Sequence, residues 1–401
     1  PQPSGVVLNV SPKFSALFEA VEPMPQDENC LVLNVWTPGL NDGQRRPVMV
    51  WLHGGAYQIG SGSSNWYDGT NLTRDGDVVV VTLNHRLGPL GYLHLAELGD
   101  ERYASSGNVG MLDIVLALEW VRENIVSFGG DPNNVTIFGE SGGGGKVSAL
   151  LAMPCAEGLF HKAIIQSGPA LSLTDPEKAT KMARRILAKL GIRPGNLDTL
   201  HGIPVEQLLA ARAAASKRRP FFLLGPVVDG RIIPRPPFEP AAAPMAADIP
   251  LLIGTTVDEA TLFLGMVPLL GTYSRDRAWS FVALPPAIRL LAGGNVQDIL
   301  EATRRSRPGH SARQLFSTVM SDWFMRIPSI RLAERKLAGG TAPVYMYSFA
   351  YESPALDGLL GAAHGMDLPF VFNNMHVAPK FTGQSDEVDH LASRMSQAWI
   401  C

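Results

Sequence analysis

The first residue whose surroundings suggest chemistry is Ser141, which lies in the pattern Gly-x-Ser-x-Gly. Residues 135–138 before it are β-branched and aromatic and predict a buried strand, and residues 146–151 after it predict a buried helix. Glycines allow the backbone to turn sharply here, and the following helix points unpaired N–H groups at the turn. A serine in this position is typical of a nucleophile elbow.

The same turn allows two other interpretations. A phosphate-binding loop has the pattern Gly-x-x-x-x-Gly-Lys-Ser/Thr, and Gly145 and Lys146 fit its end. However, Glu140 replaces the first glycine, which would set a carboxylate against the phosphate, and Val147 replaces the final hydroxyl residue. A glycine-rich turn with an incidental serine also remains open from the turn alone.

A serine hydroxyl is a weak nucleophile until a neighbouring base removes its proton. Histidine suits that task because its pKa is near neutrality, and a carboxylate must then fix its tautomer and stabilise its charged form. The chain supplies serine, acid and histidine in this order, which is the order of α/β-hydrolases. Backbone N–H groups after the serine and in the His-Gly-Gly-Ala turn at residues 53–56 would bind the oxyanion.

The elements that must position these residues alternate between strands and helices. Apolar runs predict strands at residues 31–36, 48–52, 78–83, 135–138, 163–166, 251–254 and 344–349. Apolar residues recur at three- and four-residue spacing over residues 111–125 and predict an amphipathic helix that a glycine pair ends. This alternation indicates an α/β fold with a doubly wound, mostly parallel sheet.

Ligands bind at the carboxyl ends of the strands in such a sheet. The polar or glycine-rich turns at these ends are residues 53–57, 139–142, 255–259 and 361–365. We expect a single catalytic domain over residues 1–401. Helical insertions at about 170–245 and 265–340 are expected to cover the substrate, with a helix starting at Thr174 or Asp175 and a kink at Pro328.

The composition excludes several classes of function. The 401 residues are 46% hydrophobic and 18% charged, which is typical of a globular protein. With 34 Lys and Arg against 37 Asp and Glu, the net charge of −3 argues against a nucleic-acid partner. No apolar stretch reaches the roughly 18 residues of a membrane span. Without a metal-binding motif we expect no metal and no cofactor, and three widely spaced cysteines weakly favour a cytoplasmic over a secreted protein.

Taken together, the motifs resemble those of the type-B carboxylesterases of the carboxylesterase/cholinesterase family, and they favour a bacterial member. The resembling stretches run almost from end to end: residues 28–36, 51–57, 84–91, 107–145, 166–168, 255–263 and 364–373. The run at 107–145, which includes Phe-Gly-Gly-Asp-Pro, is the longest and most specific of them. The resemblance implies an α/β-hydrolase fold and a serine esterase that forms an acyl-serine intermediate.

The resemblance also assigns the roles in the site. Ser141 becomes the nucleophile, Glu259 the triad acid and His364 the general base. The N–H groups that bind the oxyanion are then those of Gly55, Ala56 and Gly142. An unshifted His364 predicts activity that rises at about pH 6–7.

Several neighbours of these residues have open roles. Asp258 is an alternative to Glu259 as the acid, and His364 has an alternative role as a helix cap. Glu140 is expected to be a buried carboxylate that supports the site without reacting. Ser167 either forms a hydrogen bond near the triad or merely shapes its turn.

The chain departs from the family pattern at Gly142, where the family usually has alanine, and three more glycines follow. The resemblance further implies that N-terminal and C-terminal segments of the family are absent, which would leave Cys30 without a disulfide partner. The alternative to an active esterase is therefore an inactive fragment or a cholinesterase-like binding module.

The expected partner is a small-molecule ester, and the resemblance favours apolar or aromatic esters. The residues that could line its pocket, or equally the core, are Trp66, Phe263, Met266, Trp323 and Phe370. The sequence does not distinguish a monomer from a dimer.

Overall fold

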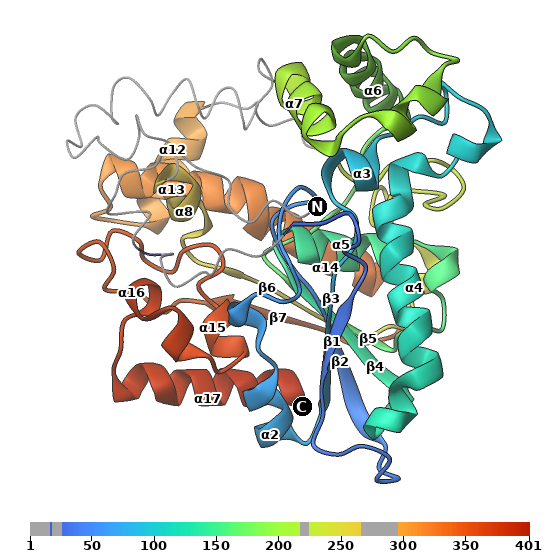
Figure 1. Cartoon of the computed structure of the whole chain (residues 1–401). Helices are drawn as coiled ribbons and strands as arrows, with labels where there is room; N and C mark the ends of the chain where they lie inside the picture. The colour runs from blue at the N-terminus through green and yellow to red at the C-terminus, as the bar shows by residue number, and fades with distance from the viewer. Residues whose placement is uncertain (1–16, 18–25, 217–223, 266–295) are drawn as a thin grey trace.

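The computed structural model describes residue 17 and residues 26–216, 224–265 and 296–401. Within this part of the chain, seven strands form one sheet in the order β1-β3-β2-β4-β5-β6-β7 (Figure 1). The strands are β1 Leu33–Trp36, β2 Arg46–Leu52, β3 Val79–Leu83, β4 Gly130–Glu140, β5 Lys162–Gln166, β6 Leu251–Thr256 and β7 Val344–Phe349. The edge strand β1 is antiparallel to β3, and every other neighbouring pair is parallel. The predicted mostly parallel sheet is confirmed.

Helices occupy most of the connections. They are α2 Thr70–Gly76, α3 Gly88–Tyr92, α4 Val109–Asn124, α5 Gly142–Leu150, α6 Pro176–Leu190, α7 Val205–Ser216, α8 Glu259–Gly265, α12 Val296–Ser306, α13 Ala312–Ser321, α14 Ile327–Gly339, α15 Leu368–Val371, α16 Pro379–Thr382 and α17 Asp386–Ile400. Helix α6 begins after Asp175, not Thr174, because the Asp175 side chain accepts a hydrogen bond from the Lys178 N–H. Gly191 ends this helix in a left-handed conformation, as predicted.

Both faces of the sheet are covered, because its central strands divide their side chains between two cores. On β2, Val48, Val50 and Leu52 belong to one core, whereas Met49 and Trp51 belong to the other. The first core includes the buried side of α4 and the second that of α17, and Figure 1 shows these helices on opposite sides of the sheet. The predicted double winding is thereby confirmed.

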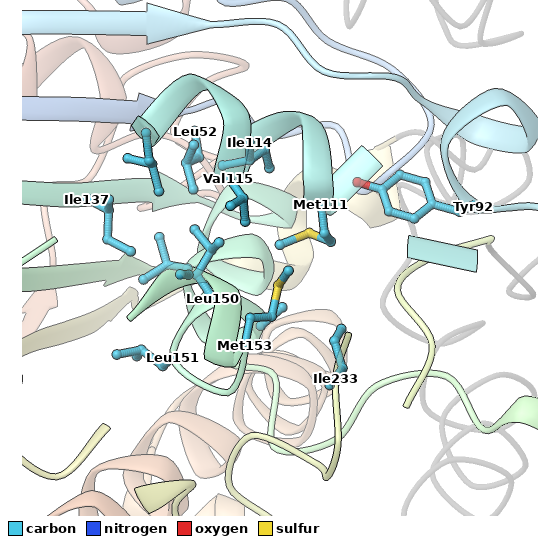
Figure 2. Close-up of a cluster of buried hydrophobic side chains, with 14 of the residues drawn as sticks. Leu52, Tyr92, Met111, Ile114, Val115, Ile137, Leu150, Leu151, Met153 and Ile233 are labelled. Atoms are coloured by element: carbon cyan, nitrogen blue, oxygen red, sulfur yellow. The ribbon is translucent and has the colours of Figure 1, made fainter. Parts of the chain in front are cut away.

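The core on the α4 side continues into the elements around Ser141 (Figure 2). Met111, Ile114 and Val115 of α4 cluster with Ile137 of β4 and Leu150 of α5, and all five are buried. Burying a side chain of this size contributes about 1.5–3 kcal/mol relative to leaving it exposed. This core therefore holds the strand and the helix on either side of the turn.

The predicted insertions are partly described. The first contains α6 and α7 and then the expected long connection, with a short 3₁₀ turn at Pro244–Ala246. In the second, residues 266–295 lie outside the described residues. Its remainder is α12, α13 and α14, and the irregularity expected at Pro328 is a π-helical turn, Asp322–Arg326, directly before α14. Proline has no N–H to continue the regular ladder, which accounts for the place of this wider turn.

The run of glycines allows α5 to begin at Gly142, earlier than the predicted start at residue 146. A Cβ on Gly143 would overlap the carbonyl oxygen of Leu52 at the end of β2. A Cβ on Gly144 would lie 2.9 Å from Cα of Gly168, in the loop after β5. The start of α5 therefore contacts the backbone of β2 and of the loop after β5, and glycine is required by this close approach.

We expect Gly143→Ala to lower the free energy of unfolding by about 1–3 kcal/mol, the typical effect of overpacking. Strand β2 cannot move aside because it pairs with both β3 and β4. Gly202→Ala is the matched control, since a Cβ there meets no atom within 4 Å. Urea denaturation of both variants measures the difference, and equal stabilities would contradict the packing of α5 on β2.

Candidate active site

Ser141 occupies the turn between β4 and α5 with φ 56° and ψ −121°, a conformation that non-glycine residues rarely adopt. Its N–H donates to the Gln166 carbonyl oxygen at 2.8 Å, and its own carbonyl oxygen accepts from the Gly145 N–H at 3.0 Å. Such strain is about 1–3 kcal/mol per residue and is concentrated at functional sites. The predicted sharp turn at the serine is therefore present.

Glu259 and His364 lie in direct contact, although they are far apart in the sequence. Glu259 begins α8 just after β6, and its Oε2 is 2.5 Å from Nδ1 of His364. Its other oxygen, Oε1, accepts from the Thr256 N–H at 2.8 Å and from the Ser167 hydroxyl at 2.5 Å. Glu259 is 1% exposed and His364 is 5% exposed, so this contact is shielded from water. A buried carboxylate with these partners fixes the orientation of the imidazole.

The neighbouring carboxylate, Asp258, has a different set of partners. Its N–H donates to the Ala362 carbonyl oxygen at 2.9 Å, and its Oδ2 accepts from the Ala362 N–H at 3.0 Å. Asp258 thus binds the loop that carries His364 to the loop that carries Glu259. The geometry favours Glu259 over Asp258 as the partner of the imidazole.

The second ring nitrogen of His364 faces Glu140. Nε2 lies 3.1 Å from Oε1 of Glu140, an ion-pair distance that lacks the alignment of a hydrogen bond. No hydrogen bond joins His364 to the Ser141 hydroxyl, both residues being within the described chain. In enzymes without bound substrate such contacts are often long and tighten only in the complex. Nε2 is therefore left without a hydrogen-bond partner on the side of the ring that a base would use.

The charges around His364 set its protonation. Burial lowers the pKa of His364, but the Glu140 and Glu259 carboxylates outweigh that effect and raise its pKa to about 9. Burial raises the pKa of Glu140 to about 8, and the nearby His364 charge opposes this rise. The neutral imidazole is therefore populated at a higher pH than the expected pH 6–7, which applied to an unshifted histidine.

The three backbone N–H groups assigned to the oxyanion are unpaired. Within the described residues, the N–H groups of Gly55, Ala56 and Gly142 donate no hydrogen bond. Gly55 and Ala56 have φ of 85° and 54°, so the loop after β2 turns in a left-handed conformation. A Cβ on Gly142 would overlap the Ala56 backbone, so glycine in place of the usual alanine lets this loop approach α5 closely.

The aromatic candidates separate into core and surface. Trp66 is 8% exposed and packs on Phe381, and Phe370 is fully buried. Phe263 and Trp323, in contrast, are 36% and 41% exposed, and the ring centroids of Phe263 and His364 are 4.8 Å apart. Met266 lies outside the described residues.

Sequence reasoning missed three further features of the site. Phe324 stacks on Trp323 and contacts the edge of Phe263, but the π-helical turn that presents it has no clear signal in the sequence. Asp367 is fully buried and accepts hydrogen bonds from Gln166 and Tyr347, each at 3.0 Å. Lys146 lies in the predicted buried helix and is itself fully buried, a position that its charge does not suggest.

The described residues include no group of His, Cys, Asp and Glu side chains that could hold a metal ion. None of the helices in the same part of the chain is long and apolar enough to cross a membrane.

Comparison with known proteins finds strong similarities along the whole chain. Residues 8–401 match the model of the family described as the carboxylesterase family. The chain is 40% identical over 381 residues to the para-nitrobenzyl esterase of Bacillus subtilis (strain 168), covering 94% of this chain and 74% of that protein. It is 34% identical over 404 residues to the phenmedipham hydrolase of Pseudarthrobacter oxydans, covering 98% of this chain and 76% of that protein.

Solved structures agree with these relatives. A carboxylesterase of Geobacillus stearothermophilus superposes with a TM-score of 0.81 at 42% identity, covering 95% of this chain and 78% of that one. A para-nitrobenzyl esterase structure gives a TM-score of 0.80 at 38% identity, covering 100% and 78% of the two chains. The sheet and helices are therefore those of the α/β-hydrolase fold.

Replacing Glu140 by glutamine should lower the pKa of His364, because a carboxylate that stabilises the imidazolium is removed. We expect the acid limb of the kcat/KM profile for 4-nitrophenyl butyrate to move to lower pH by about one unit. Glu123→Gln, on the exposed side of α4, is the control and should leave the profile unchanged. An acid limb that stays in place or moves to higher pH in Glu140→Gln would contradict this electrostatic coupling.

Proposed function

Since the chain belongs to the carboxylesterase family and is a carboxylic ester hydrolase, we propose that it works through a Ser141–His364–Glu259 triad. The observation that carries the proposal is the orientation of His364, with Nδ1 held by Glu259 at 2.5 Å and Nε2 free of hydrogen bonds. An imidazole held in this way presents its second nitrogen on the side opposite to Glu259.

In the first half-reaction, His364 removes the hydroxyl proton as Ser141 attacks the ester carbonyl carbon. The carbonyl oxygen becomes negatively charged and accepts hydrogen bonds from the unpaired N–H groups of Gly55, Ala56 and Gly142. Each such donor typically contributes about 3–4 kcal/mol to the stability of the transition state. His364 then returns the proton to the departing alcohol, and the acyl group remains on Ser141.

In the second half-reaction a water molecule takes the place of the alcohol. His364 removes a proton from the water, the hydroxyl attacks the acyl carbon, and the same N–H groups stabilise the new oxyanion. The carboxylic acid leaves as Ser141 regains its proton from His364. Glu259 stabilises the imidazolium in both steps and does not itself take the proton.

Labelling with a fluorophosphonate tests this assignment. We expect one adduct at Ser141, identified by mass spectrometry, and none in Ser141→Ala or His364→Ala. Glu259→Gln should lower kcat for 4-nitrophenyl butyrate by roughly 10⁴-fold, because the imidazole loses the group that fixes its tautomer. Folded wild-type protein that is neither labelled nor active would point to an inactive fragment or a binding module instead.

We also propose that the substrate carries an apolar or aromatic group. Support comes from a series of ring contacts that begins at His364 and continues through Phe263 and Phe324 to Trp323. All three of these aromatic rings are exposed. Phe263 is on α8, and the other two rings are on the π-helical turn. Ser321, the residue directly before this turn, accepts a hydrogen bond from the Ala260 N–H of α8, so the turn lies beside α8. An aryl or long-chain group placed against these rings would be removed from water beside the reacting carbonyl.

Phe324→Ala tests this class of substrate. Aromatic pairs contribute about 0.5–1.5 kcal/mol beyond burial, so kcat/KM for 2-naphthyl acetate should fall by roughly 2- to 10-fold. For ethyl acetate, which has no ring to place there, we expect no change. Leu116→Ala, an exposed apolar residue on α4, is the control. Equal losses for both esters in Phe324→Ala would argue against an aromatic binding wall.

A further inference from the structure

Lys146 is a fully buried amine that the proposed reaction does not use. It lies on α5, the helix that begins beside Ser141, and its Nζ donates to the His53 carbonyl oxygen at 2.7 Å. The same Nζ lies 5.7 Å from the centroid of the Tyr57 ring. In the described part of the chain no carboxylate forms an ion pair with it. Burial of an amine without a carboxylate partner is unfavourable, so its presence here requires a specific reason.

The carbonyl that Lys146 binds belongs to the first peptide of the oxyanion loop, which we define as residues 53–56. The His53 ring stacks on His85, with centroids 4.9 Å apart and an interplanar angle of 11°. At the other end of the loop, the Gly55 carbonyl oxygen accepts from the N–H groups of Gln58 and Ile59, both at 3.2 Å. The loop is thus anchored on both sides, while the N–H groups of Gly55 and Ala56 stay unpaired.

We propose that Lys146 is a positioning residue that holds the oxyanion loop in the conformation that stabilises the tetrahedral intermediate. This role rests on the proposed function. One helix would then fix both parts of the site, because α5 supplies the Gly142 N–H at its first turn and binds the loop through Lys146 at its second. The nucleophile and the oxyanion donors would then be held in one relative position.

A lysine is suited to this task because both of its protonation states donate a hydrogen bond. Burial lowers the pKa of Lys146 to about 7, and the Glu140 charge opposes that effect. The amine and the ammonium both retain N–H groups, so the contact with His53 persists on either side of this pH. An apolar side chain of the same length would leave the buried carbonyl without this donor.

Lys146→Met tests the proposal, and the chain offers a matched control in Lys336→Met. Lys336 is also fully buried and donates to a backbone carbonyl oxygen, that of Ala247, at 2.9 Å. Ala247 precedes β6 and therefore lies near the amino ends of the strands, whereas the active site is at their carboxyl ends. Both variants lose a buried amine and its hydrogen bond, but only one of them affects the oxyanion loop.

For 4-nitrophenyl butyrate we expect Lys146→Met to lower kcat by about 10- to 100-fold, a smaller effect than that of removing a direct oxyanion donor. KM should change by less than about twofold. An aryl trifluoromethyl ketone, which forms a tetrahedral adduct with the serine, should bind more weakly by about the same factor. Lys336→Met should lower the melting temperature but leave kcat and the ketone affinity per folded molecule unchanged.

Two results would overturn the proposal: a folded Lys146→Met enzyme whose kcat stays within twofold of wild type, or equal effects on kcat in the two variants. If Lys146→Met does not fold, Lys146→Leu decides by the same criteria, since leucine also lacks a hydrogen-bond donor. A wild-type protein that neither hydrolyses the ester nor reacts with a fluorophosphonate would overturn the proposed function as well. An active wild type with an insensitive variant would overturn the role of Lys146 alone.

Discussion

Backbone-to-backbone packing at the start of α5 is the constraint on which the site depends. Gly142 lies against the Ala56 backbone, Gly143 against the Leu52 carbonyl and Gly144 against Gly168. No side chain stands between these segments to absorb a misfit, so the helix start, the loop after β2 and the loop after β5 must hold one mutual position. The position of the nucleophile then follows from that of the sheet.

The same packing offsets backbone strain. Ala56, Ser141 and Ser167 have positive φ, and each lies on one of the turns that meet at α5. Strained residues persist only where the surroundings over-determine their conformation. Here the two cores on either side of the sheet provide that support, since β2, β4 and β5 are buried between them. The free energy gained by packing the two cores thus offsets the strain of the peptides at the strand ends.

The sequence predicted the features that depend on neighbouring residues, and it did not predict those that depend on residues far apart in the chain. Strands β1 to β7 and helices α4 and α6 were predictable because periodicity and caps are local signals. No local pattern chooses between Asp258 and Glu259, because the two are adjacent in the sequence. What distinguishes them is that Asp258 pairs with Ala362, in the loop that carries His364. The exposure of Phe324 depends on a π-helical turn, which changes the phase of the helix in a way that a regular repeat does not anticipate.

The protonation states of the buried groups were the least predictable feature of the site, because they depend on contacts between residues far apart in the sequence. His364 and Glu140 can carry one proton between them in two ways, as imidazolium with carboxylate or as imidazole with carboxylic acid, and both have the same net charge. Burial favours the neutral pair, whereas the Glu259 carboxylate favours the imidazolium. The basicity of Nε2 is therefore a property of the three groups together and not of the histidine alone. A local sequence pattern identifies each group, but only the fold determines the balance among them.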